Sequence, residues 1–286
     1  MVLIWRLLFR VVGRVVPFGA MRRLARPLAW CFYQLGLRRS VTLANLRLAF
    51  PGLAQPALNQ LARRSFASTL TTLLELLPLR YLTNAQLSRV LKVNNLELLS
   101  PEKNGRGALL LSAHFGNWEL LAFGTAAIAG TPFNIIVKQQ RDAGETDQTR
   151  IARGNRVIPY ERGALESARL LNGGGVVALL ADQSATASDH LTTMFGIPTW
   201  TFSTPARLAL RFRPRVVVGF AVRQPDGSYQ AELQELRHDD LPDTPEGAAQ
   251  FTQRYVDCLQ SAIRQHPEQW MWQHRKWKHT AGVKYE

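Results

Sequence analysis

A histidine and a carboxylate lie five residues apart in the stretch SAHFGNWELL, residues 112 to 121, as His114 and Glu119. A neutral imidazole accepts a proton near neutral pH. A carboxylate bonded to its other nitrogen fixes the tautomer and stabilises the imidazolium as it forms. The sequence contains no G-x-S-x-G nucleophile elbow. The pair therefore predicts general base catalysis on a hydroxyl that belongs to a substrate.

The spacing alone is weak evidence, because a chain with 6 His and 21 acidic residues contains such pairs by chance. His238 precedes Asp243 at the same spacing, but in a Pro-containing acidic loop with no apolar strand before it. His114 follows an apolar run, and Gly116 permits a close approach of the backbone. This context favours His114 and Glu119 as the site, and the alternative is a hydrogen-bonded core histidine.

The elements that must position this pair follow from the apolar pattern. Residues 108–111 predict a buried strand and residues 118–129 a helix, so His114 falls in a strand-to-helix loop. Residues 41–100 have helical apolar spacing, and a long last helix is predicted over residues 244–266. Further strands are predicted over 134–137, 156–158, 176–181 and 216–222. The alternation of strands and helices predicts an α/β sheet flanked by helices.

The composition limits the class of protein and its partners. A chain of 286 residues with 46% hydrophobic residues can bury a substantial core as one large domain or two small ones. Lys and Arg number 35 against 21 acidic residues, and the net charge of +14 predicts an anionic partner. Cys31 and Cys258 are too few for a disulfide scaffold or a metal site, so a reducing cytosol is the expected environment.

The N-terminal segment, residues 1–38, is strongly apolar but repeatedly interrupted by arginine. It lacks the roughly 18 uncharged apolar residues of a membrane span, and no secretory signal is expected. Arg6, Arg10 and Arg14 are spaced to share one helical face. We therefore predict a helix that lies in the membrane plane near anionic headgroups. The alternative is an amphipathic helix that docks on the core of the protein itself.

Five stretches of the sequence resemble segments of the bacterial lipid A late acyltransferases, the lauroyl and myristoyl transferase family. They occur in the same order along the chain as in that family. HFGNWE is similar to the H-x4-D/E motif of glycerolipid acyltransferases. The other four stretches are RRSVTLANLRLAFPG (38–52), RGNRVIP (153–159), GGGVVALLADQ (173–183) and HPEQWMWQHRKWK (266–278). The resemblance covers nearly the whole chain and implies a glycerolipid-acyltransferase-like fold, in which a central mixed sheet is flanked by helices.

The resemblance also implies the reaction and the roles of residues. It implies acyl transfer from acyl carrier protein to a hydroxyl of a lipid A precursor, at the cytoplasmic face of the inner membrane, without cofactor or metal. His114 would be the general base and Glu119 its charge partner. The residues expected to bind substrate are Arg153, with Arg150 in reserve, and Asn117, Asp182 and Gln183. Residues 1–38 would associate with the membrane and residues 39–286 would form the acyltransferase domain.

The C-terminal stretch interleaves Trp270, Trp272 and Trp277 with basic residues. Alone, this pattern fits a nucleic-acid stacking surface or a membrane-interface belt. The lipid interpretation accounts for this stretch, the N-terminal helix and the net charge together, so no nucleic-acid partner is expected. Two alternatives stay open at this point. One is an acyltransferase for another glycolipid or an amino-acid-containing lipid, and the other is a basic membrane- or nucleic-acid-binding protein without catalysis.

Overall fold

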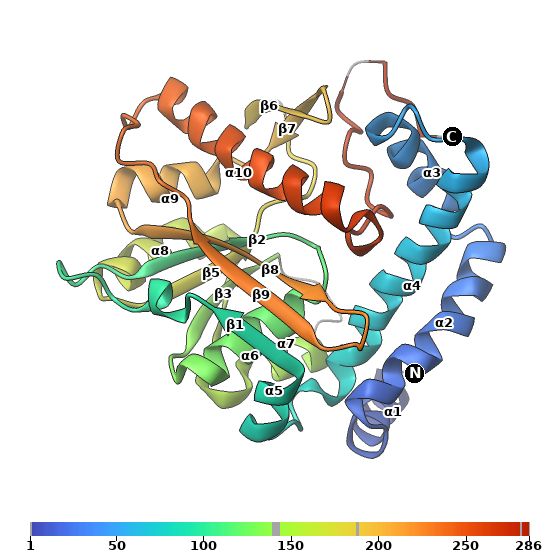
Figure 1. Ribbon diagram of the computed structural model, residues 1–286. Coiled ribbons are helices and arrows are strands. Elements are labelled where there is room, and N and C mark those ends of the chain that lie inside the picture. Colours follow the sequence, from blue (N-terminus) through green and yellow to red (C-terminus); the bar gives the residue numbers. More distant parts are fainter. Residues whose placement is uncertain (1, 139–143, 187–188, 281, 286) are drawn as a thin grey trace.

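The computed structural model describes residues 2–138, 144–186, 189–280 and 282–285, with side chains described from residue 9 onward. A seven-stranded sheet in the order β1-β9-β8-β2-β5-β3-β4 forms its centre (Figure 1). The strands are β1 (Leu91–Asn94), β2 (Ala108–Ser112), β3 (Phe133–Val137), β4 (Arg156–Pro159), β5 (Val176–Leu180), β8 (Arg215–Arg223) and β9 (Tyr229–Glu235). Strands β6 (His190–Met194) and β7 (Ile197–Thr201) form a separate antiparallel hairpin.

The sheet is mixed, as predicted, because β8 and β9 run antiparallel while the other neighbouring strands pair in parallel. Every residue of β2 is buried, as expected for a strand covered on both faces. Side chains alternate along a strand. Accordingly, Leu109 and Leu111 pack with residues of α8 (Tyr160–Asn172), α9 (Thr204–Phe212) and α10 (Pro245–Gln265). Leu110 faces the other way and packs with α6 (Trp118–Ala129).

The N-terminal part of the chain is helical and lies beside the sheet (Figure 1). It comprises α1 (Val2–Val15), α2 (Phe18–Gln34), α3 (Arg39–Ala49), α4 (Gln55–Leu79) and α5 (Asn84–Val90). The long helix α4 packs against α1, α2 and α3. Gly13 of α1 lies so close to α4 that a Cβ there would collide with the carbonyl oxygen of Leu77. Helix α1 therefore docks on the protein itself, as the alternative interpretation of this segment predicted.

Two of the three arginines expected to face headgroups contact the protein. Arg10 forms an ion pair with Glu145 at 2.9 Å, and the guanidinium of Arg14 lies 5.5 Å from the centre of the Tyr81 ring. The side chain of Arg6 lies outside the described part. Apolar side chains of α1 and α2 are nevertheless exposed, among them Val11, Val15, Leu24, Leu28, Trp30 and Phe32. Among the described residues, no helix is long and apolar enough to cross a membrane.

The observed elements confirm most of the predicted ones. All five predicted strands are present, α6 has the predicted bounds, and α10 corresponds to the predicted last helix. Sequence reasoning missed β1, β9 and the β6–β7 hairpin. The pattern of β9 carries a signal that could have found it, because buried and exposed residues alternate from Tyr229 to Leu233. The hairpin turns at Phe195 and Gly196, which both have positive φ angles, as a type I′ turn requires.

Candidate active site

His114 and Asp182 occupy equivalent positions after two neighbouring parallel strands. Strands β2 and β5 pair in parallel with Ser112 opposite Leu180. The residues two positions further along each strand, His114 and Asp182, therefore leave the sheet side by side at its carboxyl edge. This edge is where open α/β sheets place their ligand sites. The register of the sheet thus brings together two residues that are 68 positions apart in the sequence.

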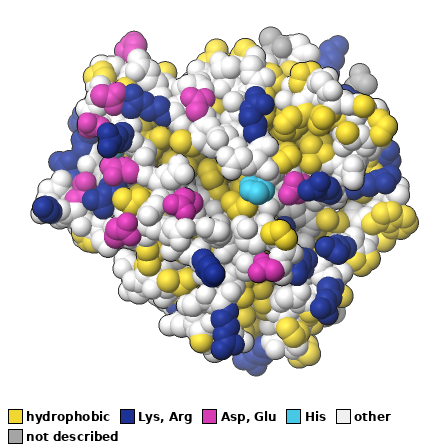
Figure 2. Space-filling view, in the orientation of Figure 1, with side chains coloured by type: hydrophobic (Ala, Val, Ile, Leu, Met, Phe, Trp, Pro, Cys, Tyr) yellow, Lys and Arg dark blue, Asp and Glu magenta, His cyan; other side chains and the backbone are white. Residues whose placement is uncertain are grey.

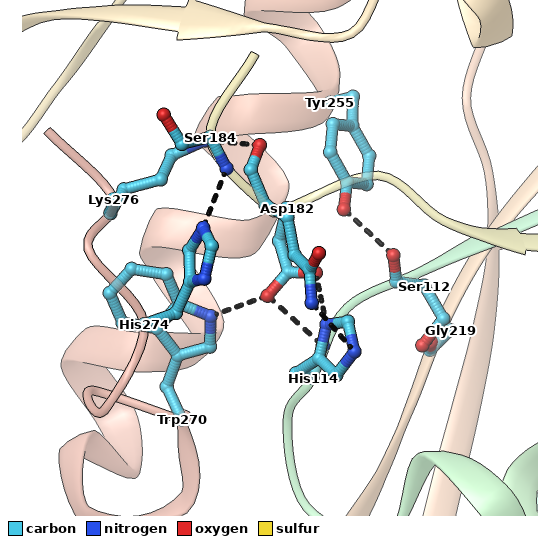
Figure 3. A network of polar contacts seen from close by, with 10 residues as sticks. Ser112, His114, Asp182, Ser184, Gly219, Tyr255, Trp270, His274 and Lys276 are labelled. Atoms are coloured by element: carbon cyan, nitrogen blue, oxygen red, sulfur yellow. Dashed lines mark hydrogen bonds and ion pairs between the residues drawn. The ribbon is translucent and has the colours of Figure 1, made fainter. Parts of the chain in front are cut away.

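Three donors hold the carboxylate of Asp182 (Figure 3). Nδ1 of His114 lies 2.8 Å from Oδ1, and the backbone N–H of His114 donates to Oδ2 at 3.0 Å. The indole N–H of Trp270 also donates to Oδ2, at 2.9 Å. Burial by itself would raise the pKa of Asp182. The positive charge and hydrogen bond of His114, followed by the Trp270 bond and the charge of Lys276, lower this pKa to about 2.

The ionised Asp182 fixes the tautomer of His114. A carboxylate only accepts hydrogen bonds, so Nδ1 carries the proton and Nε2 is left with a free lone pair. Nε2 lies 3.3 Å from the side-chain nitrogen of Gln183, whose amide N–H can donate to it. The ring of Trp118 packs edge-on against the imidazole with 5.2 Å between ring centres. The imidazole is therefore oriented by its neighbours, with its basic nitrogen beside Gln183.

A cavity of about 260 Å³ opens at the carboxyl edge of the sheet beside His114. His114, Gln183 and Arg150 line it together with apolar side chains from the ends of β3 and β5, including Ile136 and Leu179. A second cavity of about 50 Å³ shares several of these apolar residues and is also lined by Trp118 and Leu121 of α6. Mostly apolar walls with a few convergent polar groups are typical of small-ligand sites.

Glu119 binds Arg150 and not the imidazole of His114. Its carboxylate oxygens accept from the Arg150 guanidinium at 2.5 and 3.0 Å, in a bidentate pair. Arg150 comes from α7 (Gly144–Ile151). The predicted contact between Glu119 and His114 is therefore corrected, since Asp182 occupies the place on Nδ1. The reason is geometric: Glu119 lies in the first turn of α6, whereas Nδ1 of His114 faces the residue that follows the neighbouring strand β5.

The two candidate arginines point in different directions. Arg150 lines both cavities through its position next to Glu119. Arg153 lies two residues beyond the end of α7 in a left-handed conformation, with φ of 66°. Its guanidinium donates to the carbonyl of Leu82 and to the side chain of Asn84. The order of preference is thus reversed: Arg150 is the arginine of the cavity, and Arg153 binds the segment that leads into α5.

Asn117 belongs to the scaffold of the site. Its side-chain oxygen accepts from the backbone N–H of Leu120 and caps α6, while its amide nitrogen donates to buried Glu75 at 2.8 Å. Both side-chain groups are therefore committed within the protein, which argues against the predicted contact with substrate. The neighbouring Gly116 has a φ of 60°, and a Cβ there would collide with the carbonyl oxygen of Ala221. This close approach explains the glycine in HFGNWE.

Sequence reasoning missed the support that the C-terminal segment gives to the site. His274 accepts from the backbone N–H of Ser184 through Nε2, at 3.0 Å. Lys276 is buried, and its ammonium lies 3.4 Å from the carbonyl oxygen of Gln183. Burial lowers the pKa of Lys276 to about 8, although the nearby carboxylate of Asp182 opposes the shift. The stretch HPEQWMWQHRKWK gave a signal for function, but the pattern did not show that it lies beside His114.

The second histidine pair lies elsewhere. His238 is within 3.3 Å of the carbonyl oxygen of Leu236, and Asp243 forms a long ion pair with Arg211 at 3.7 Å. Neither residue lines the cavity beside His114. Within the described ranges, no group of three or more His, Cys, Asp or Glu residues could hold a metal ion.

Comparison with known families gives a match over nearly the whole chain. The sequence profile of the family described as bacterial lipid A biosynthesis acyltransferase matches residues 2–279. This range includes the cavity, His114, Asp182 and the C-terminal segment around Trp270. No curated protein matches the chain with significant similarity.

Proposed function

We propose that this chain, which belongs to the family of bacterial lipid A biosynthesis acyltransferases, transfers a fatty acyl group from acyl carrier protein to a hydroxyl of a lipid A precursor. The observation that carries the proposal is the state of His114. Nδ1 lies 2.8 Å from the carboxylate of Asp182, which leaves Nε2 to accept a proton, and the ring lines a cavity whose walls combine apolar side chains with a few polar ones. A base beside an apolar pocket suits a reaction between a hydroxyl and a fatty acyl thioester.

In the proposed reaction, Nε2 of His114 accepts the proton of the acceptor hydroxyl while its oxygen attacks the thioester carbonyl. The carbon–sulfur bond then breaks, and the leaving thiolate of acyl carrier protein takes the proton from the imidazolium. The products are an ester and a free thiol, and His114 returns to its starting state. Asp182 stabilises the imidazolium throughout. Gln183 donates to Nε2 before substrate arrives and yields this place to the hydroxyl.

The acyl chain would occupy the apolar cavities. The two cavities share Ile136, Val137, Leu179 and Leu180, and the smaller one extends the apolar lining to α6. Arg150 lies at both cavities, where its guanidinium can stabilise negative charge that develops on the thioester oxygen or is carried by a lipid phosphate. Its bidentate pair with Glu119 holds the guanidinium in place.

The lipid acceptor places the reaction at a membrane surface, and we propose the cytoplasmic face of the inner membrane. Helices α1 and α2 expose apolar side chains, with Val15 73% and Trp30 58% accessible. Figure 2 shows hydrophobic and basic side chains interspersed along the right-hand side, where α2 and α4 run. Exposed apolar groups beside cations favour binding to anionic lipid. The net charge of +14 also suits an acidic acyl carrier protein.

The test is acyl transfer by the purified chain from acyl carrier protein to a lipid A precursor, followed by mass spectrometry of the lipid. We expect one additional acyl group with the normal protein, and we expect it to form about 10²- to 10⁴-fold more slowly with His114→Ala. Deletion of the gene should remove one secondary acyl chain from lipid A in the cell. An unchanged lipid A would contradict the proposal, and a change in another glycolipid would identify a different acceptor.

A further inference from the structure

We infer that Trp270 is a positioning residue for the base: its indole N–H holds the Asp182 carboxylate in the orientation that receives the Nδ1–H of His114. The inference rests on the proposed role of His114 in acyl transfer. The side chain of Trp270 lines neither cavity, so its indole N–H would act on the base through Asp182. The argument starts from the bonds on this carboxylate and then considers what holds the indole.

The carboxylate of Asp182 has two distinct sides. Oδ1 faces Nδ1 of His114, and Oδ2 accepts from the His114 backbone and from the Trp270 indole. A carboxyl group rotates about the bond to its Cβ unless both oxygens are held. Asp182 is only 4% exposed, so water cannot easily replace a missing donor. Of these three donors, the indole N–H is the one that does not belong to His114. As a second donor on Oδ2, it ties the carboxylate to a different part of the chain and further resists the rotation that would weaken the bond to Nδ1.

The indole is itself fixed by a short segment that brackets His114. The backbone N–H of Met271 donates to the carbonyl of His114 at 2.9 Å, and that of Gly116 donates to the carbonyl of Gln269 at 2.9 Å. Trp270 lies between these two bonds and is 2% exposed. Ser65 of α4 donates to its carbonyl at 3.1 Å. The loop that carries the base and the residue that orients its carboxylate are thus parts of one bonded unit.

The C-terminal segment supplies matched controls for this indole. Trp272 and Trp277 are fully buried and pack edge-on against Trp270, with 4.6 and 6.4 Å between ring centres. Their indole N–H groups donate elsewhere, to the carbonyl of Pro267 at 2.6 Å and to the hydroxyl of Thr199 at 2.7 Å. Replacing any of the three by Phe removes a buried indole N–H from the same cluster. Only the replacement at Trp270 removes a hydrogen bond to Asp182.

The experiment compares W270F with W272F and W277F in the full-length protein, by acyl transfer kinetics and thermal unfolding. We expect W270F to lower kcat by about 10- to 100-fold, the usual range for a residue that orients a functional group, with little change in KM. The two control variants should keep kcat within about threefold of the normal value, even where they lower the unfolding temperature as much as W270F does. Equal losses of kcat in all three would overturn the inference.

A nearly isosteric replacement covers the case in which W270F fails to fold. Incorporating β-(3-benzothienyl)alanine at position 270 keeps the bicyclic shape and exchanges only the N–H for sulfur. It should lower kcat as W270F does, and a normal kcat would refute the positioning role.

The low-field proton resonance of the His114 Nδ1–H, recorded by NMR, gives a readout that needs no lipid substrate. We expect the resonance to move when the indole N–H is removed from position 270 and to stay in place in W272F. If it moves in a protein that shows no acyl transfer, the proposed function fails and the positioning role stands. If the normal protein is active and neither the resonance nor kcat responds, the positioning role fails alone.

Discussion

The regions around His114 and His238 share one spacing pattern but differ in what surrounds the histidine. In each, a carboxylate follows five residues later, and in each that carboxylate binds an arginine: Arg150 for Glu119 and Arg211 for Asp243. His114 nevertheless has a carboxylate on Nδ1, because Asp182 follows the neighbouring parallel strand. His238 has a carbonyl oxygen there instead. The difference teaches that sheet register, more than sequence spacing, gives a histidine its partner.

The largest effect should come from removing the two histidines in turn. His114→Ala should lower turnover by about 10²- to 10⁴-fold, the usual contribution of a general base. His238→Ala should leave turnover nearly normal, because this residue lies away from the cavity. Steady-state acyl transfer with both purified variants tests the comparison. A comparable loss in the two variants would mean that the base has been assigned to the wrong region.

The next largest effect concerns the carboxylates. Asp182→Asn should lower turnover by roughly 10²-fold or more, because an amide can present a donor to His114 and favour the wrong tautomer. Combining it with His114→Ala should cost no more than His114→Ala alone, since the two residues act as one unit. Asp243→Asn is the matched control and should be close to neutral. Additive losses of turnover in the double variant would show that Asp182 does not act through His114.

A smaller effect is expected from the two arginines of the α7 region, measured as the free energy of unfolding in urea. Arg150→Gln should destabilise the protein by roughly 3 kcal/mol, because it leaves buried Glu119 without its charge partner. Arg153→Gln should cost about 1 kcal/mol or less, since its partners are neutral groups near the surface. Turnover should fall in the first variant only. A larger loss of stability and turnover with Arg153→Gln than with Arg150→Gln would show that Arg153 is the arginine of the site.

The smallest effect concerns pH and a third histidine, His274. Burial lowers its pKa to about 4, opposed by the charge of Asp182 and assisted by Lys276. The unfolded chain therefore binds more protons between pH 6.5 and 4, so stability falls as the pH falls through this window. The loss should reach at most about 3 kcal/mol, and less to the extent that the ring is hydrated.

Urea unfolding at pH 7 and pH 4.5 measures this loss, and His274→Gln is the control, because it can still accept from Ser184 but does not titrate. The difference in stability between the two pH values should be smaller in this variant. An unchanged difference would assign the acid sensitivity to other groups.

The sequence predicted individual strands and helices better than the contacts between elements that are far apart in the chain. The strand that ends at Ser112, the helix that begins at Trp118 and the position of His114 in the loop between them all follow from apolar pattern and turn residues. The partner of His114 does not, because it depends on which strand lies beside β2 and in what register. The choice between Arg150 and Arg153 depends on a left-handed turn at Arg153, which the residue type does not signal. Long-range pairing was therefore the part that pattern alone could not supply.

The family resemblance identified the C-terminal stretch as specific, and the structure explains why aromatic residues gather there. Trp270, Trp272 and Trp277 are core residues and do not form an exposed stacking surface. The pattern of Trp and basic residues suits a membrane belt or a nucleic-acid platform equally well, so pattern could not decide. Because these three rings are buried, they can form neither a membrane belt nor a nucleic-acid platform. Helices α1 and α2, in contrast, do expose apolar side chains, such as Val15 and Trp30.

The C-terminal segment also sets the order in which the site can be completed during synthesis. It joins distant parts of the chain, since Asn45 donates to the carbonyls of Trp272 and His274, Ser65 to that of Trp270, and Trp270 to Asp182. A ribosome adds roughly 5 to 20 residues per second, so strands β2 and β5 emerge many seconds before these partners. The nascent chain thus carries its base and carboxylate without the segment that fixes them. Contacts of such long sequence separation form late. We therefore expect the pair of His114 and Asp182 to gain its bond from Trp270 only after the residues that follow α10 have been made.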